Sequence, residues 1–114
     1  MRILPLVLLL ASSASLAAPI RVAIESGDAN ASSAELAAQL ADDTWFDFEV
    51  TQVTADQVDS AAELASYDVV VIGDSGHNGV DWTSEMATAL DAWVQAGSGG
   101  VVGVGWIDFV YAEV

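Results

Sequence analysis

The chain of 114 residues carries 17 Asp or Glu residues against two Lys or Arg residues, which gives a formal net charge of −15. Nucleic-acid phosphates and anionic lipid surfaces need Lys and Arg for their neutralisation, so this charge excludes nucleic acid and membrane surfaces as expected partners. The chain has no cysteine. Its absence excludes a disulfide framework, a thiol nucleophile, a thiolate zinc site and an iron–sulfur cluster.

Residues 1–18 have the organisation of a cleavable signal peptide. Arg2 supplies a positive charge, the stretch from Ile3 to Leu10 is apolar, and small residues follow it. A membrane-spanning helix needs about 20 apolar residues, and several serines interrupt this stretch too early for one. We therefore expect cleavage after about Ala17 or Ala18, and a secreted or periplasmic product.

Residues 19–114 predict a single acidic α/β domain. Once Arg2 is removed, Arg21 is the only strong cation beside the 17 acids, so the formal net charge of the mature chain is −16. The acids are spread along the chain instead of being grouped at ligand spacing. We expect them to serve solubility in salty surroundings, and we predict neither a metal site nor a cofactor.

The first half of the domain predicts strand, helix and strand. Ile20 to Glu25 is a short strand and residues 26–30 form a loop. A capping box of Ser32 and Glu35 then opens a helix. Trp45 to Val53 alternates apolar and polar residues, as a half-buried strand does, with Trp45 packed at its start.

The second half adds two helices and two strands. A second capping box of Thr54 and Gln57 opens a short helix. Val69 to Ile72 is a continuous β-branched stretch, typical of a parallel strand covered on both faces. Residues 83–97 form an amphipathic helix, and Val101 to Trp106 is another buried strand. The inward residues expected of the two helices are Val58, Ala61, Ala62 and Ala65 in the first and Met86, Leu90, Trp93 and Val94 in the second.

The resulting order, β-α-β-α-β-α-β, predicts four parallel strands with helices on both faces. In open sheets of this kind, ligands bind outside the carboxyl ends of the strands. Three segments qualify, namely residues 26–30, 74–81 and 106–108.

The last predicted strand would leave an apolar edge, and the chain stops eight residues after it. An unpaired edge of this kind invites association. Residues 107–114 could cover it, a second copy could pair with it, or the chain could be the front portion of a longer domain, which is the interpretation we favour.

The predicted core also shows a family resemblance. It is carried by Tyr67-Asp68-Val69-Val70-Val71-Ile72-Gly73-Asp74, by Ala89-Leu90-Asp91-Ala92-Trp93-Val94, and by the stretch from Ala96 to Trp106. This pattern resembles the ThuA-like and class I glutamine-amidotransferase-like superfamily. The resemblance implies a three-layer, flavodoxin-like sheet and, through the ThuA-like members, an association with sugar metabolism.

The same resemblance argues against catalysis. An amidotransferase of this group has its nucleophilic Cys where Gly105 stands, and the His and Glu of its triad lie beyond Val114. The ThuA-like members often carry His where Gly105 or Trp106 stands. We therefore expect a degenerate, noncatalytic member.

The segment from Gly73 to Gly79 supports an alternative reading. Its sequence, Gly-Asp-Ser-Gly-His-Asn-Gly, resembles the nucleophile block of SGNH (GDSL-type) esterases, with Ser75 as nucleophile and His77 as a neighbouring base. However, the block normally opens its domain, and the partner blocks are not present downstream. A Gly-rich turn in which Asp74 and Ser75 bond backbone amides explains the segment equally simply.

The candidate ligand-binding residues all fall in the three loop segments or beside them. Trp82 and Trp106 are included because an aromatic ring can stack on a sugar. The full set is Ser26, Asp28, Asp74, Ser75, His77, Asn78, Trp82, Trp106 and Asp108.

Three functions remain open. The first is a secreted binding module for a small polar or carbohydrate ligand, or for a protein partner, at the carboxyl edge of the sheet. The second is a serine esterase that uses Ser75. The third is an envelope or assembly component that pairs through its last strand.

Overall fold

The computed structural model describes residues 17–25, 31–72 and 83–104. Within these ranges it contains a four-stranded sheet, three α-helices and one short 3₁₀ turn. The elements in chain order are β1 (Ile20–Glu25), α1 (Ala31–Leu40), β2 (Phe48–Val53), η1 (Ala55–Gln57), α2 (Ala61–Leu64), β3 (Val69–Ile72), α3 (Ser84–Gln95) and β4 (Gly100–Gly103).

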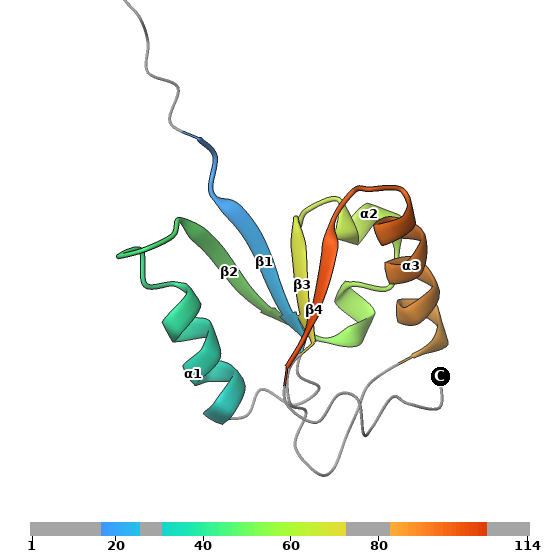
Figure 1. Cartoon of the computed structure of the whole chain (residues 1–114). Coiled ribbons are helices and arrows are strands. Elements are labelled where there is room, and N and C mark those ends of the chain that lie inside the picture. Colours follow the sequence, from blue (N-terminus) through green and yellow to red (C-terminus); the bar gives the residue numbers. More distant parts are fainter. Residues whose placement is uncertain (1–16, 26–30, 73–82, 105–114) are drawn as a thin grey trace, which may run out of the picture.

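All four strands are parallel and lie in the order β2-β1-β3-β4 (Figure 1). The helix α1 lies on one side of the sheet, and α2 and α3 lie on the other, so the molecule has three layers. This confirms the predicted α/β fold and its flavodoxin-like arrangement. The strand order reverses direction between β1 and β3, because the chain first moves outward to β2 and then returns past β1.

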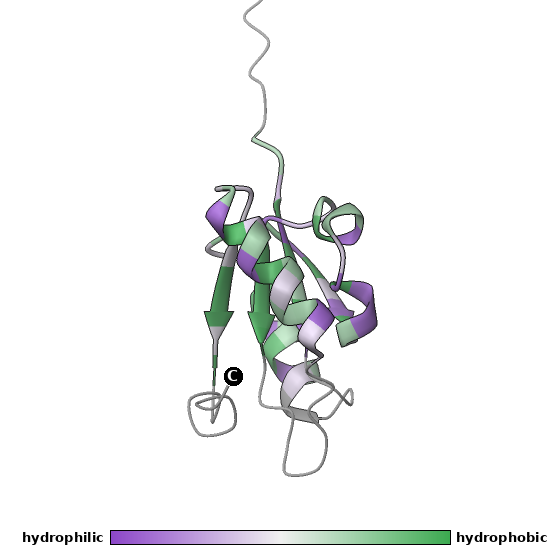
Figure 2. Cartoon of the chain, turned by 90° about the vertical axis from the view of Figure 1, so that its right-hand side faces the viewer, coloured by the Kyte–Doolittle hydropathy of each residue, from purple (hydrophilic) through white to green (hydrophobic). Residues whose placement is uncertain are grey.

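The side chains of the sheet divide between the two faces with the two-residue period of a strand. In β1, Val22 and Ile24 belong to the core under α1, whereas Ala23 belongs to the core under α2 and α3. Seen from the α3 side, Figure 2 shows apolar strands behind a helix on which hydrophilic and hydrophobic residues alternate. The amphipathic pattern of α3 thus directs Met86, Leu90 and Trp93 into the core.

The two faces are packed to different extents. Among the described residues, the face under α2 and α3 holds ten buried hydrophobic residues, whereas the α1 face holds three. Val102 lies in register with Val71 of the α1 face, yet 48% of it is exposed. Among the described residues, no helix therefore covers β4 on that side.

The end of α3 is fixed by its backbone. Gly97 has a φ of +69°, and its N–H donates to the carbonyl of Val94 at 2.9 Å. The N–H of Ser98 donates to the carbonyl of Trp93 at 3.1 Å. This pair of bonds is a Schellman motif, which favours glycine at the left-handed position.

Gly99 has a different role, because it lies against the side chain of Trp93. A Cβ atom at this position would overlap the six-membered ring of Trp93, whereas a Cβ on the neighbouring Gly100 would meet no atom within 4 Å. The chain can turn tightly from α3 into β4 past Trp93 only because residue 99 has no side chain.

The second predicted strand is shorter than expected. Its partner β1 begins at Ile20, which pairs with Phe48, and the preceding Pro19 has no N–H to donate. Trp45 and Phe46 therefore precede the strand and are 83% and 65% exposed. The prediction that Trp45 packs at the start of a strand was wrong.

The predicted helix after Thr54 is split in two. The N–H of Thr54 does donate to the side chain of Gln57 at 3.0 Å, but the turn that it opens ends at Gln57. Ser60 then accepts from the N–H of Glu63 and starts α2 afresh. This restart changes which side of the helix faces the sheet, so Leu64 is buried. Three residues that were expected to face inward are instead exposed, namely Ala61, Ala62 and Ala65.

Three smaller features also differ from the prediction. The helix α1 begins at Ala31, so Ser32 lies inside it instead of capping it. Val94 of α3 was expected inward but is 43% exposed. The strand β4 begins at Gly100 and was expected to begin at Val101, while its predicted continuation from residue 105 onward lies outside the described residues.

Candidate functional site

The carboxyl ends of β1, β3 and β4 lie side by side at one edge of the sheet. The register pairs Glu25 with Ile72, and Ile72 with Gly103. Because the strand order reverses between β1 and β3, the ends of these two strands flank the topological switch point, where open α/β sheets bind their ligands. In the sequence, each of the three predicted ligand-binding segments comes after one of these strands.

The predicted site residues themselves lie outside the described residues, so their mutual arrangement stays a prediction. They are Ser26, Asp28, Asp74, Ser75, His77, Asn78, Trp82, Trp106 and Asp108. What the structure does describe at this edge is the carboxyl ends of β1, β3 and β4, together with two buried polar side chains.

The more informative of these side chains is Glu25, which is only 1% exposed. It is the last residue of β1, and its register partners are Val53 and Ile72 on the neighbouring strands. Strand alternation places it on the same face as Ala23, toward α2 and α3. A carboxylate in such surroundings is costly unless it is well bonded, and Glu25 does have an interaction partner.

The second buried polar residue is Ser33, in the first turn of α1, which is 3% exposed and also has a partner. The helix α3 starts at the same edge, where the hydroxyl of Thr83 accepts from the N–H of Met86 at 3.1 Å. Two helix amino termini thus meet this edge, and their partial positive charge favours polar or anionic groups there.

Sequence reasoning placed Glu25 in the strand but missed it as a site residue. The signal was present, because Glu25 follows the apolar residues Val22, Ala23 and Ile24 and directly precedes a predicted ligand-binding loop. A buried acid in that position is a stronger indication of function than an exposed acid inside a loop.

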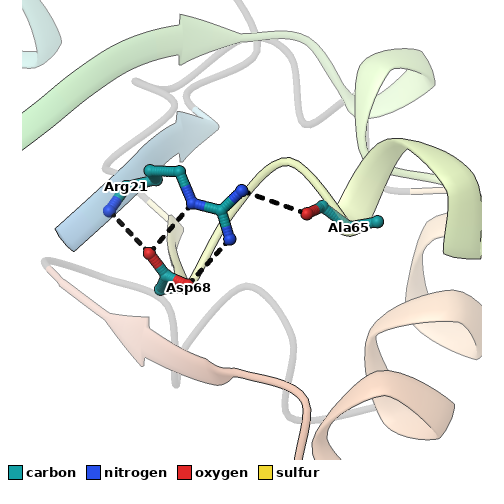
Figure 3. Close-up of polar contacts among 3 residues, drawn as sticks. All are labelled: Arg21, Ala65 and Asp68. Atoms are coloured by element: carbon teal, nitrogen blue, oxygen red, sulfur yellow. Dashed lines mark hydrogen bonds and ion pairs between the residues drawn. The ribbon is translucent and has the colours of Figure 1, made fainter. Parts of the chain in front are cut away.

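The opposite, amino edge of the sheet contains an ion pair between Arg21 of β1 and Asp68, which immediately precedes β3 (Figure 3). Nη2 and Nε of Arg21 donate to the two oxygens of Asp68 at 2.9 and 3.1 Å, and Nη1 donates to the carbonyl of Ala65 at 3.2 Å. The N–H of Arg21 also donates to Asp68, at 2.8 Å. Hydrogen bonds from Arg21 hold the pKa of Asp68 at about 2, below its ordinary value of 3.8.

This ion pair is structural in character. Its carboxylate and guanidinium satisfy one another, and they join β1 to β3 at the start of their pairing. A hollow of about 390 Å³ borders Arg21, but alanine side chains from α2 and α3 form most of its wall. It therefore offers few polar groups that could orient a ligand.

The part of the chain that the structure describes contains no group of three or more His, Cys, Asp or Glu residues close enough to hold a metal ion. Within the same residues, no helix is long and apolar enough to cross a membrane. Comparison of the chain with protein-family models, with curated proteins and with solved structures gave no match in any of the three.

Proposed function

We propose that this chain is an extracytoplasmic, noncatalytic binding module that holds a small polar or carbohydrate ligand at the carboxyl edge of its sheet, between β1 and β3. The observation that carries the proposal is the burial of Glu25 at the switch point of the strand order. Buried acidic residues at such positions are typical of functional sites.

The loops that leave this edge support the same proposal. They contain Asp28, Asp74 and Asn78 as polar candidates, and Trp82 and Trp106 as stacking candidates. The resemblance to the ThuA-like and amidotransferase-like group adds sugar metabolism as a context, and Gly105 in place of the nucleophilic Cys favours binding over catalysis.

Export is part of the proposal. The proposed cleavage sites, after Ala17 or Ala18, stand two or three residues before β1 begins at Ile20. Both alanines are exposed and lie outside any helix or strand, so a peptidase could reach them without disturbing the sheet. Mass spectrometry of the protein secreted from its host would show a mature chain beginning at Ala18 or Pro19, and an intact Met1 would contradict export with cleavage.

The ligand is tested by calorimetric titration with a panel of neutral monosaccharides and oligosaccharides. We expect one member to bind, and we expect Trp82→Ala or Trp106→Ala to weaken that binding at least tenfold. Trp45→Ala is the matched control, because Trp45 is exposed at the other end of the sheet and should leave the affinity unchanged. No binding by any sugar would end the carbohydrate version of the proposal, and an equal loss in all three variants would contradict the location.

A serine esterase is the second candidate. Its support is positional, since β3 ends at Ile72, three residues before Ser75, and a nucleophile of this type directly follows a strand. Hydrolysis of a nitrophenyl ester that disappears in Ser75→Ala would favour the esterase. The absence of hydrolysis in the wild-type protein would remove it.

An assembly role is the third candidate, supported by the exposure of β4. Val101 and Val102 are 38% and 48% exposed on a strand that ends the described sheet. Exposed strand edges can pair with another chain. Light scattering at high salt, where charge repulsion is screened, would give a multiple of the monomer mass if copies pair, and the monomer mass if they do not.

A further inference from the structure

A second surface lies at the opposite end of the sheet, where residues 41–47 connect α1 to β2. The connection extends away from the sheet (Figure 1), and it presents Trp45 and Phe46 with 83% and 65% of their surface exposed. Phe46 stacks on Phe48, with ring centroids 5.4 Å apart and an angle of 12° between the planes. We call Trp45, Phe46 and Phe48 the aromatic patch.

The aromatic patch borders a small hollow of about 150 Å³. Its other lining residues are Gln39 and Leu40 from the end of α1 and Asp42 from the connection. A hollow of this size accommodates a single long side chain, with apolar walls for its stem and a carboxylate at the rim. Two adjacent, exposed aromatic residues beside such a hollow are typical of an interaction site.

Acidic residues flank the patch in the sequence. Asp42 lines the hollow itself, and Asp42, Asp43 and Asp47 are all exposed. The N–H of Thr44 donates to Asp42 at 3.0 Å, and the Thr44 hydroxyl donates to the same oxygen. These bonds lower the pKa of Asp42, so its carboxylate stays charged at the rim of the hollow.

We propose that the aromatic patch docks a basic segment of another protein, with an Arg or Lys side chain laid across Trp45 and Phe46 and its charge facing Asp42 and Asp43. Aromatic faces attract guanidinium and ammonium groups, and neighbouring carboxylates add ion pairs. The net charge of −15 attracts a cationic partner from a distance. Charge complementarity therefore favours a basic peptide over a neutral sugar at this surface.

The test uses the full mature chain and a fluorescein-labelled hexapeptide of alternating Arg and Gly, with a Gln-Gly peptide as the neutral probe. Fluorescence anisotropy should show binding of the Arg peptide and at least tenfold weaker binding of the Gln peptide. Trp45→Ala should weaken binding of the Arg peptide at least tenfold. Because Trp45 is so exposed, circular dichroism of this variant should match that of the wild type.

A pair of double variants separates local contacts from general charge. Asp42→Asn with Asp43→Asn should weaken Arg-peptide binding at least fivefold. The matched control, Glu85→Gln with Asp91→Asn, removes the same charge from the exposed face of α3 and should change binding less than twofold at moderate salt. Equal losses in both double variants would overturn the proposal, because binding would then reflect net charge alone.

Two further results would also overturn it. One is equal binding of the Arg and Gln peptides. The other is binding of cellohexaose in place of the Arg peptide, with a loss in Trp45→Ala, which would make the patch a sugar platform. Glu25→Gln should leave peptide binding unchanged, so the outcome here is independent of the function proposed for the carboxyl edge.

Discussion

Each end of the sheet contains an acidic residue, and the two residues differ in how far their side chains are exposed to solvent. At the amino end, Asp68 has 43% of its side chain exposed and is neutralised by Arg21. At the carboxyl end, Glu25 is 1% exposed and is the last residue of β1. This difference supports the proposed division of labour, in which Asp68 secures the fold and Glu25 belongs to the ligand site.

The largest expected effect comes from the core near the amino end. Leu64 is fully buried in the cluster under α2 and α3. Leu64→Ala removes most of a buried side chain and leaves a cavity, so we expect the free energy of unfolding in urea to fall by about 3 kcal/mol. A fall below about 1 kcal/mol would show that the amino end contributes less to the fold than its packing indicates.

The turn after α3 provides a smaller effect with an internal control. Gly99→Ala places a methyl group against the ring of Trp93, and such overpacking costs about 1–3 kcal/mol. Gly100→Ala meets no atom within 4 Å and should be close to neutral in the same unfolding experiment. Equal stability of the two variants would contradict the close approach of Gly99 to Trp93.

The ion pair predicts a pH dependence. The pKa of Asp68 is about 2 in the folded chain and 3.8 ordinarily, so its carboxylate stabilises the fold fully above about pH 4 and loses that contribution as the pH falls toward 2. The wild type should therefore exceed Asp68→Asn in thermal stability at pH 6, and the difference should shrink between pH 4 and pH 2. A difference that stays constant over this range would contradict the role of the ion pair.

Much of the fold could be predicted from local patterns. The β-branched stretch of β3, the strand from Ile20 to Glu25 and the amphipathic helix α3 each have a strong period and clear ends, and all three are confirmed. The order of these elements was then enough to predict a parallel sheet with helices on both faces.

The errors concern the start of β2 and the split before α2, where contacts with other parts of the chain decide the boundaries of the element. The alternation from Trp45 onward resembles a strand, but the strand starts only where Ile20 supplies a partner for Phe48. The split before α2 had a visible signal in Ser60 and Glu63, which have the spacing of a capping box and compete with the capping box at Thr54. Overlapping signals of this kind are resolved by packing, here by the burial of Leu64.

The location of the candidate site was predicted from the order of the strands and not from particular residues. Parallel strands bring their carboxyl ends, at Glu25, Ile72 and Gly103, to one edge, and the sequence was sufficient to identify that edge. The burial of Glu25 could not be read locally, because it depends on β2 and β3 flanking β1 at Val53 and Ile72.

The most direct test of the division of labour compares Glu25→Gln with Asp68→Asn in one calorimetric titration at pH 6, using the sugar that binds the wild type. We predict that Glu25→Gln, which keeps the size of the side chain but removes its charge, weakens binding at least tenfold, and that Asp68→Asn lowers stability while leaving the affinity within twofold. Unchanged affinity in a folded Glu25→Gln variant would contradict a ligand site at the carboxyl end of β1.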